Sequence, residues 1–158
     1  MLRYHSYNIV FQEVPGELTL AINISNCPNG CKGCHSPHLQ ENSGEELSEN
    51  ALCMMLTTYK SAITCVCFMG GDAEPDNVEK LALYVQKITE GTVKTAWYSG
   101  KSSFPKNCST DSFNYIKLGS YIPEMGGLNQ PTTNQRFYRV QNGLLVDETK
   151  QFWKKERI

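Results

Sequence analysis

The pattern of apolar and polar residues divides the chain into short strand-like runs and two longer helical runs. Residues 7–14 (YNIVFQEV) and 17–24 (ELTLAINI) lie on either side of Pro15-Gly16, and this arrangement predicts a β-hairpin. Residues 62–69 (AITCVCFM) are apolar on both faces, as a strand buried in a parallel sheet is. Two further strand-like runs follow, TVKTAWY at 92–98 and FNYIKLG at 113–119, and Asn142-Gly143 predicts a second hairpin near the end of the chain.

Both helical runs carry an apolar face and a candidate first residue. In the first run Ser48 is suited to cap a helix whose apolar positions are Leu52, Met55, Leu56 and Tyr59. In the second run Asp76 and Glu79 form a possible capping box, and Gly91 marks the end. Its apolar positions are Val78, Leu81, Ala82, Val85 and Ile88.

Strands that alternate with helices predict an α/β fold with a mostly parallel sheet. The chain has too few such units to close an eight-stranded barrel, so we expect a partial (β/α) barrel or an open sheet. No linker divides the sequence, and residues 1–158 are predicted to form a single domain. Loops after parallel strands meet at one rim of the sheet, so we expect the loop after residue 24, Gly70-Gly71-Asp72 and Ser99-Gly100 to lie together there.

Composition narrows the function classes. The net charge is −1 and no basic stripe is present, which argues against nucleic-acid binding. The first ten residues lack the apolar core of a signal peptide, and no apolar run is long enough to span a membrane, so we expect a cytoplasmic protein. Seven cysteines, an odd number, without a secretory signal favour metal or redox chemistry over a disulfide scaffold.

Three of the cysteines, Cys27, Cys31 and Cys34, lie in the stretch CPNGCKGCH. Thiolates bind zinc and iron–sulfur clusters, and a structural zinc site would need a fourth ligand such as His35 or His38. A [4Fe–4S] cluster held by three cysteines instead keeps one iron open for another ligand, and we favour that interpretation. The remaining cysteines fit other roles: Cys53, Cys65 and Cys67 as core residues and Cys108 as a free thiol in a loop.

These motifs together resemble a known family. CxxxCxxC after a core strand and a Gly-Gly-acid turn after the next resemble the radical S-adenosylmethionine enzymes. CxxxCxGCH, FMGGD and GGLNQPTTNQRFY then narrow the resemblance to the activating enzymes of anaerobic (class III) ribonucleotide reductase, from about Gly16 to Val140. Gly33 stands where many radical S-adenosylmethionine enzymes carry an aromatic residue, and Asp72 stands in place of glutamate.

The resemblance implies a fold and a set of site residues. The fold would be a partial barrel of the radical S-adenosylmethionine type. Cys27, Cys31 and Cys34 would hold a [4Fe–4S] cluster whose fourth iron binds the amino and carboxylate groups of S-adenosylmethionine. The backbone from Gly33 through Cys34 to His35 would contact the adenine. The implied cofactor-binding residues further along the chain are Gly70 and Gly71 at the methionine amino group, Asp72 as the residue that orients that turn or adds charge complementarity, and Ser99 at a ribose hydroxyl.

The implied activity is that of an oxidoreductase. The cluster would reduce S-adenosylmethionine to a 5′-deoxyadenosyl radical, and this radical would install a glycyl radical on anaerobic ribonucleotide reductase. The implied partners are that reductase and an electron donor such as a flavodoxin or ferredoxin. Asn134, Gln135 and Arg136 are either partner contacts or stabilisers of the last strand, and Arg136 fits a surface ion pair equally well. The alternatives are a radical S-adenosylmethionine enzyme acting on a peptide or small molecule, and a non-catalytic Cys₃His zinc or iron–sulfur binding module.

Overall fold

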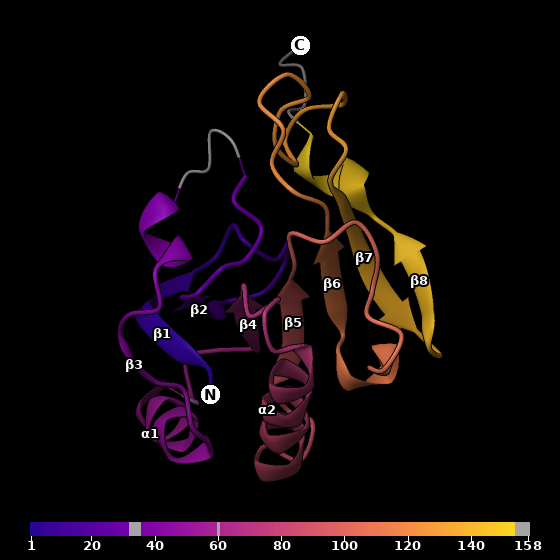
Figure 1. The fold of residues 1–158 in the computed structure, drawn as a ribbon. Coiled ribbons are helices and arrows are strands. Elements are labelled where there is room, and N and C mark those ends of the chain that lie inside the picture. Colours follow the sequence, from indigo (N-terminus) through magenta and orange to yellow (C-terminus); the bar gives the residue numbers. More distant parts are fainter. Residues whose placement is uncertain (32–35, 60, 154–158) are drawn as a thin grey trace.

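The computed structural model describes residues 1–31, 36–59 and 61–153. Its strands form one eight-stranded sheet in the order β3-β1-β2-β4-β5-β6-β7-β8 (Figure 1). The strands are β1 (Arg3–Val10), β2 (Thr19–Ile24), β3 (Glu45–Glu46), β4 (Cys65–Met69), β5 (Lys94–Tyr98), β6 (Tyr115–Leu118), β7 (Arg136–Gln141) and β8 (Leu144–Asp147). Two α-helices, α1 (Glu49–Tyr59) and α2 (Pro75–Ile88), and three short 3-10 helices, η1 (Pro37–Gln40), η2 (Thr110–Ser112) and η3 (Thr149–Phe152), complete the described elements.

The sheet is mixed, and this corrects the predicted fold class. Only the central block β2-β4-β5-β6 is parallel. The other four pairings, β1 with β2, β1 with β3, β6 with β7 and β7 with β8, are antiparallel. The prediction of a mostly parallel, partial (β/α) barrel of the radical S-adenosylmethionine type is therefore wrong. Antiparallel hairpins extend the parallel block at both sides, and β3 and β8 end the sheet instead of closing it.

Local signals account for both hairpins. The loop between β1 and β2 contains Pro15 and Gly16, and Gly16 has a φ of 79°. At the β7–β8 turn Asn142 and Gly143 have φ values of 52° and 77°. Two consecutive positive φ angles are typical of a type I′ turn, the tight connection that the Asn-Gly pair predicted.

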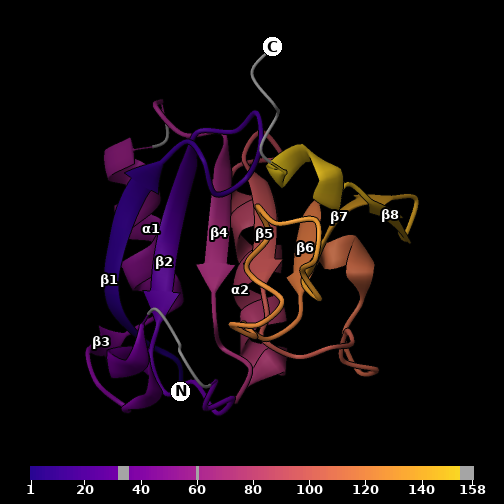
Figure 2. The same ribbon diagram turned by 90° about the horizontal axis from the view of Figure 1, so that it is seen from above.

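The helices pack on one face of the sheet and loops cover the other (Figure 2). On the helix face, alternate strand residues such as Ile22, Phe68, Trp97 and Ile116 form the larger core with α1 and α2. On the opposite face, Cys65, Cys67, Ala96, Tyr98 and Phe137 form a smaller cluster. Val14, Leu128 and Phe152, from the β1–β2 loop, the β6–β7 loop and η3, pack on that cluster.

The helix starts agree only in part with the sequence-based expectations. The Ser48 hydroxyl accepts a hydrogen bond from the Ala51 amide at 3.1 Å, which confirms its capping role at α1. The second helix begins at Pro75 with Glu74 as the N-cap residue, two residues before the predicted cap Asp76. Glu79 does not complete a capping box there, because its carboxylate accepts hydrogen bonds from Ser112 Oγ and the Ser109 amide near η2.

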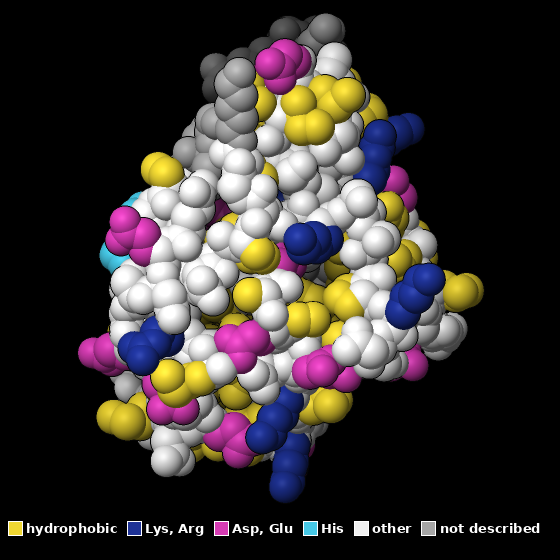
Figure 3. Space-filling model, in the orientation of Figure 1, with side chains coloured by type: hydrophobic (Ala, Val, Ile, Leu, Met, Phe, Trp, Pro, Cys, Tyr) yellow, Lys and Arg dark blue, Asp and Glu magenta, His cyan; other side chains and the backbone are white. Residues whose placement is uncertain are grey.

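Charged side chains of both signs are interspersed over the face that Figure 3 shows, and no broad patch of one sign forms there. Among the described residues, no helix combines the length and apolar character needed to cross a bilayer.

Candidate functional site

The loop that carries the cysteines leaves β2 and is closed at its base by backbone hydrogen bonds. The Asn26 amide donates to the Glu41 carbonyl at 3.0 Å, and the Cys27 amide donates to the Leu39 carbonyl at 2.9 Å. Asn26 has a φ of 61°, so the chain turns sharply just before Cys27. The cysteine loop is thereby fixed at the carboxyl end of the parallel block.

Cys27 and Cys31 are half-buried free thiols in this loop. The third predicted ligand, Cys34, and the predicted adenine neighbours Gly33 and His35 lie outside the described residues. Within the ranges that are described, no group of three or more His, Cys, Asp or Glu side chains is arranged to hold a metal ion. Ligation of a cluster by Cys27, Cys31 and Cys34 therefore stays a prediction.

Asp72 joins the three loops that were predicted to meet at one rim. Its Oδ1 accepts a hydrogen bond from Ser99 Oγ at 2.6 Å. Its Oδ2 accepts from Asn29 Nδ2 at 2.7 Å and from the Gly100 amide at 2.9 Å. Asn29 belongs to the cysteine loop, Asp72 follows β4, and Ser99-Gly100 follows β5. These bonds confirm that the three loops lie together.

The two glycines before Asp72 have backbone conformations that other residues rarely adopt. Gly70 and Gly71 have φ values of 109° and 86°. A Cβ on Gly71 would lie 2.5 Å from Val78 Cγ2, so the turn packs directly against α2. The Gly70 amide donates to the Tyr98 carbonyl at 3.0 Å, and its carbonyl accepts from Trp97 Nε1 at 2.7 Å. The turn is consequently fixed by both β5 and α2.

Ser99 is almost fully buried, and its hydroxyl already has two partners. Besides donating to Asp72, Ser99 Oγ accepts a hydrogen bond from the Lys101 amide at 3.0 Å. In this structure Ser99 therefore holds Asp72, and its contact with a ribose hydroxyl stays a prediction. The Asp72 carboxylate likewise joins its turn to the loop after β5 and to the cysteine loop, and its role toward S-adenosylmethionine stays a prediction.

Two side chains at this rim, Asn29 and Lys117, were not singled out from the sequence. Lys117 Nζ donates to the carbonyls of Gly119 at 2.9 Å and Ser99 at 3.3 Å. Burial lowers the pKa of Lys117, while Asp72 and Cys31 act in the opposite direction and stabilise the ammonium. Side chains along a strand alternate between its two faces, so Lys117 lies on the same face as Tyr115, near the end of the predicted strand 113–119. That position could have indicated from the sequence that Lys117 lies at the rim.

The donors near the thiols suit an iron–sulfur cluster. Asn29 Nδ2 donates a hydrogen bond to Cys27 Sγ at 3.4 Å. The positive charge of Lys117 and this N–H group both favour anionic sulfur ligands. Gly30, between Cys27 and Cys31, has a φ of 55°, and a Cβ there would meet no atom within 4 Å. No described atom therefore crowds the loop at Gly30.

The predicted partner residues near the start of β7 are engaged within the chain. Asn134 Nδ2 donates to the Ser120 carbonyl at 3.0 Å, and Gln135 Nε2 donates to the Gly119 carbonyl at 3.3 Å. Arg136 Nη1 lies 3.8 Å from Asp147 Oδ2, and both side chains are nearly half exposed. Asn134 and Gln135 therefore hold the loop that follows β6, and Arg136 forms the surface ion pair that was one of its two interpretations.

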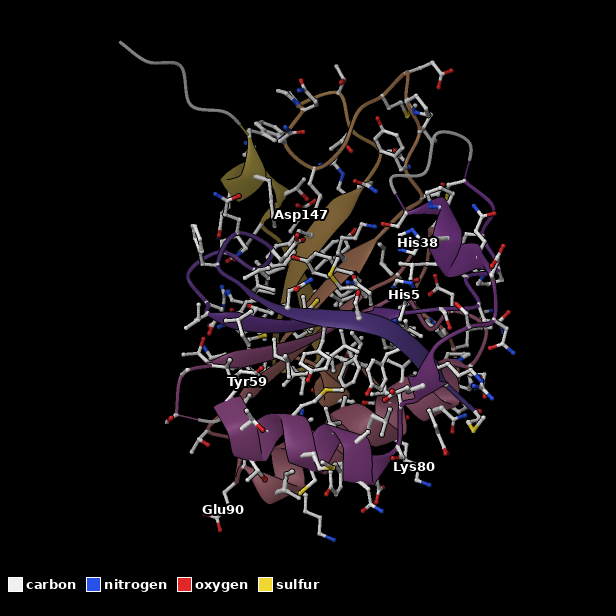
Figure 4. All side chains as sticks on the ribbon, turned by 90° about the vertical axis from the view of Figure 1, so that its left-hand side faces the viewer. His5, His38, Tyr59, Lys80, Glu90 and Asp147 are labelled. Carbon is white, nitrogen blue, oxygen red and sulfur yellow. The ribbon has the colours of Figure 1, made fainter. Side chains whose placement is uncertain are left out.

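His38, the alternative zinc ligand, lies on η1 beside β1. Its ring centroid is 4.7 Å from that of His5, and Figure 4 shows the two rings next to each other. Cys65 and Cys67 are fully buried on β4, as predicted, and burial raises the pKa of the Cys65 thiol to about 12. These two thiols are consequently core residues.

Comparison with known proteins supports iron–sulfur chemistry. A search of curated proteins and a search of solved structures each returned no match. The family described as a 4Fe-4S single cluster domain matches residues 15–118, more than half of the chain. The matched segment runs from the turn before β2 to the end of β6, and so contains the whole parallel block and the cysteine loop. The chain therefore belongs to the 4Fe-4S single cluster domain family.

Proposed function

We propose that this protein is an activating enzyme that uses a [4Fe–4S] cluster and S-adenosylmethionine to install a glycyl radical on anaerobic ribonucleotide reductase. The observation that carries the proposal is the junction at Asp72. Its carboxylate connects the cysteine loop to the ends of β4 and β5 through Asn29, Ser99 and Gly100. A small molecule bound beside a cluster at the thiols would therefore lie against all three loops.

The residues at this junction suggest a division of roles. Cys27, Cys31 and Cys34 would hold three irons and leave the fourth for the amino and carboxylate groups of S-adenosylmethionine. Gly70 and Gly71, whose positive φ angles shape the turn after β4, would lie at the methionine amino group, and Asp72 would orient their turn. When bound, the cluster supplies the single electron that cleaves S-adenosylmethionine, and the protein supplies orientation.

Lys117 adds a positive charge to the same rim. Two backbone carbonyls fix its ammonium group; burial lowers its pKa, and nearby Asp72 and Cys31 act in the opposite direction. A fixed cation suits both an anionic cluster and a carboxylate ligand. This charge supports binding of an anionic group at the rim.

The proposed protein substrate is the reductase itself, and the proposed electron donor is a flavodoxin or ferredoxin. Arg136 is the member of the TNQR segment best placed to meet a partner, since its guanidinium is nearly half exposed. Its contact with Asp147, at 3.8 Å between exposed groups, is weak enough to exchange for a partner carboxylate.

The reaction can be tested by electron paramagnetic resonance. One electron, one S-adenosylmethionine and the hydrogen atom of a glycine Cα would give methionine, 5′-deoxyadenosine and the glycyl radical. The cluster-loaded protein, mixed anaerobically with its reductase, a reductant and S-adenosylmethionine, should give the doublet signal of a glycyl radical. Cys31→Ala should abolish the signal, because one iron loses its ligand.

Cys53→Ala is the matched control, since Cys53 is a half-buried free thiol on α1. It should support the glycyl radical as well as the parent does. A radical signal of equal size from Cys31→Ala, or no signal from the cluster-loaded parent, would refute the proposed function.

A further inference from the structure

Asn29 lies between two proposed cluster ligands and contacts one of them. Its Nδ2 donates to Cys27 Sγ at 3.4 Å and to Asp72 Oδ2 at 2.7 Å. A primary amide has two N–H groups, and a thiolate and a carboxylate can only accept. Both partners therefore require the nitrogen of Asn29, not its oxygen, on this side. The orientation of the amide is set by its neighbours.

The carboxylate that positions Asn29 is itself held. Ser99 Oγ bonds Asp72 Oδ1 at 2.6 Å, and the Gly100 amide bonds Oδ2 at 2.9 Å. Gly100 also packs closely on Asn29, since a Cβ there would lie 2.5 Å from Nδ2 and 3.0 Å from Cγ. The ends of β4 and β5 thus aim one N–H of the cysteine loop at the Cys27 sulfur.

We propose that Asn29, held by Asp72, is a positioning residue that raises the reduction potential of the cluster through its hydrogen bond to Cys27. The inference rests on the proposed function, because it needs Cys27 as a cluster ligand. An N–H donated to a ligand sulfur withdraws electron density from that sulfur. It therefore stabilises the reduced cluster, which carries one more negative charge than the oxidised cluster.

Reduction of the cluster adds one electron and breaks no bond. In the experiment dithionite supplies that electron through mediator dyes. The position of the equilibrium is the midpoint potential, and it reports the electrostatic effect of Asn29. A residue that merely closed the loop would change cluster content or stability and leave the midpoint potential of the assembled cluster unchanged.

The first test compares Asn29→Leu with the parent in a redox titration followed by electron paramagnetic resonance. Leucine has a similar size and no N–H group, so the midpoint potential should fall while iron and sulfide per chain stay the same. Asn77→Leu is the matched control. Asn77 lies on α2 and is also half-buried. Its Nδ2 donates to the carboxylate of Glu74, the N-cap residue of that helix, at 2.9 Å. Its midpoint should equal that of the parent.

A second variant displaces the amide without removing it. The methyl group of Gly100→Ala would overlap Asn29 Nδ2, the mobile end of that side chain, and push it from Cys27. We expect a lower midpoint potential again. The double variant Asn29→Leu/Gly100→Ala should shift no further than Asn29→Leu alone, because both changes remove the same hydrogen bond.

An unchanged midpoint in a cluster-loaded Asn29→Leu protein would overturn the inference, as would an equal shift in Asn77→Leu. If Asn29→Leu fails to assemble a cluster, the midpoint potential of Gly100→Ala becomes the deciding measurement. A midpoint equal to that of the parent in Gly100→Ala would then overturn the inference. These outcomes leave the proposed function intact. A parent protein that assembles no cluster would instead refute the proposed function and this inference with it.

Discussion

At the scale of single residues, Asp72 is the best-connected side chain of the candidate site. Three donors from two other loops converge on its carboxylate, and Ser99, one of them, is almost fully buried. A carboxylate with three hydrogen bonds is strongly held, and its removal leaves donors without an acceptor. Asp72 therefore stabilises the rim whether or not a cofactor is bound.

Replacing Asp72 with alanine should lower the unfolding free energy of the cluster-free protein by about 2–4 kcal/mol, since the buried Ser99 hydroxyl and the Gly100 amide lose their acceptor. Urea denaturation measures this change. Asp76→Ala is the control, because Asp76 is exposed. Its replacement should lower the unfolding free energy by less than about 1 kcal/mol. Equal losses in the two variants would show that the Asp72 junction is not a stabilising feature.

The sequence predicted which loops meet at the rim and missed how they are connected. Gly70, Gly71, Asp72 and Ser99 follow neighbouring strands of the parallel block, and the strand order alone brings them together. Asn29 was missed because its direction depends on the conformation of the cysteine loop. Local sequence spacing does not determine that conformation.

At the scale of elements, a second polar cluster connects the starts of three strands. Glu17 precedes β2, and its Oε1 accepts hydrogen bonds from Lys94 Nζ of β5 at 2.7 Å and Tyr115 of β6 at 2.9 Å. Burial of Glu17 raises its pKa, but the hydrogen bonds from Lys94, Thr64 and Tyr115 outweigh burial, so the pKa of Glu17 is lowered. The charged carboxylate therefore holds the amino ends of these strands together.

The lowered pKa of Glu17 predicts a pH-dependent stability. At pH values between the folded pKa of Glu17 and its ordinary value of 4.5, the unfolded chain binds more protons than the folded protein. Stability therefore rises with pH in that range. Glu17→Gln should cost about 1–3 kcal/mol near neutral pH, and its difference from the parent should shrink as the pH falls below 4.5. Urea denaturation at several pH values measures both effects.

Glu124→Gln provides the reference for Glu17, because Glu124 is exposed in the β6–β7 loop. Its effect should stay within about 0.5 kcal/mol at every pH. A constant difference between Glu17→Gln and the parent across the acid range would contradict the role given to the Glu17 carboxylate.

The elements themselves were largely predictable, and their combination was less so. Ser48 at the first helix and Asn142-Gly143 at the last hairpin act through local geometry, which the sequence carries directly. The pairing of β6 with β7 depends on the long segment between Leu118 and Arg136, whose course has no simple sequence signal. This is why the antiparallel pairing of β7 with β6 was not predicted.

At the scale of the whole molecule, the parallel block and the family match coincide. Residues 15–118 contain β2, β4, β5 and β6 with both α-helices, and β1, β7 and β8 lie outside the match. The cysteine loop and the Asp72 junction lie at the carboxyl end of this block. The fold thus places the proposed cluster site within the segment that the family shares, while the antiparallel strands extend the sheet on either side.

The most direct measurement is the amount of 5′-deoxyadenosine formed when the anaerobically reconstituted protein is reduced and mixed with S-adenosylmethionine. We expect about four irons and four sulfides per chain, and 5′-deoxyadenosine and methionine in equal amounts. Cys31→Ala should form neither product. A colourless protein that contains stoichiometric zinc and forms no 5′-deoxyadenosine would contradict the account.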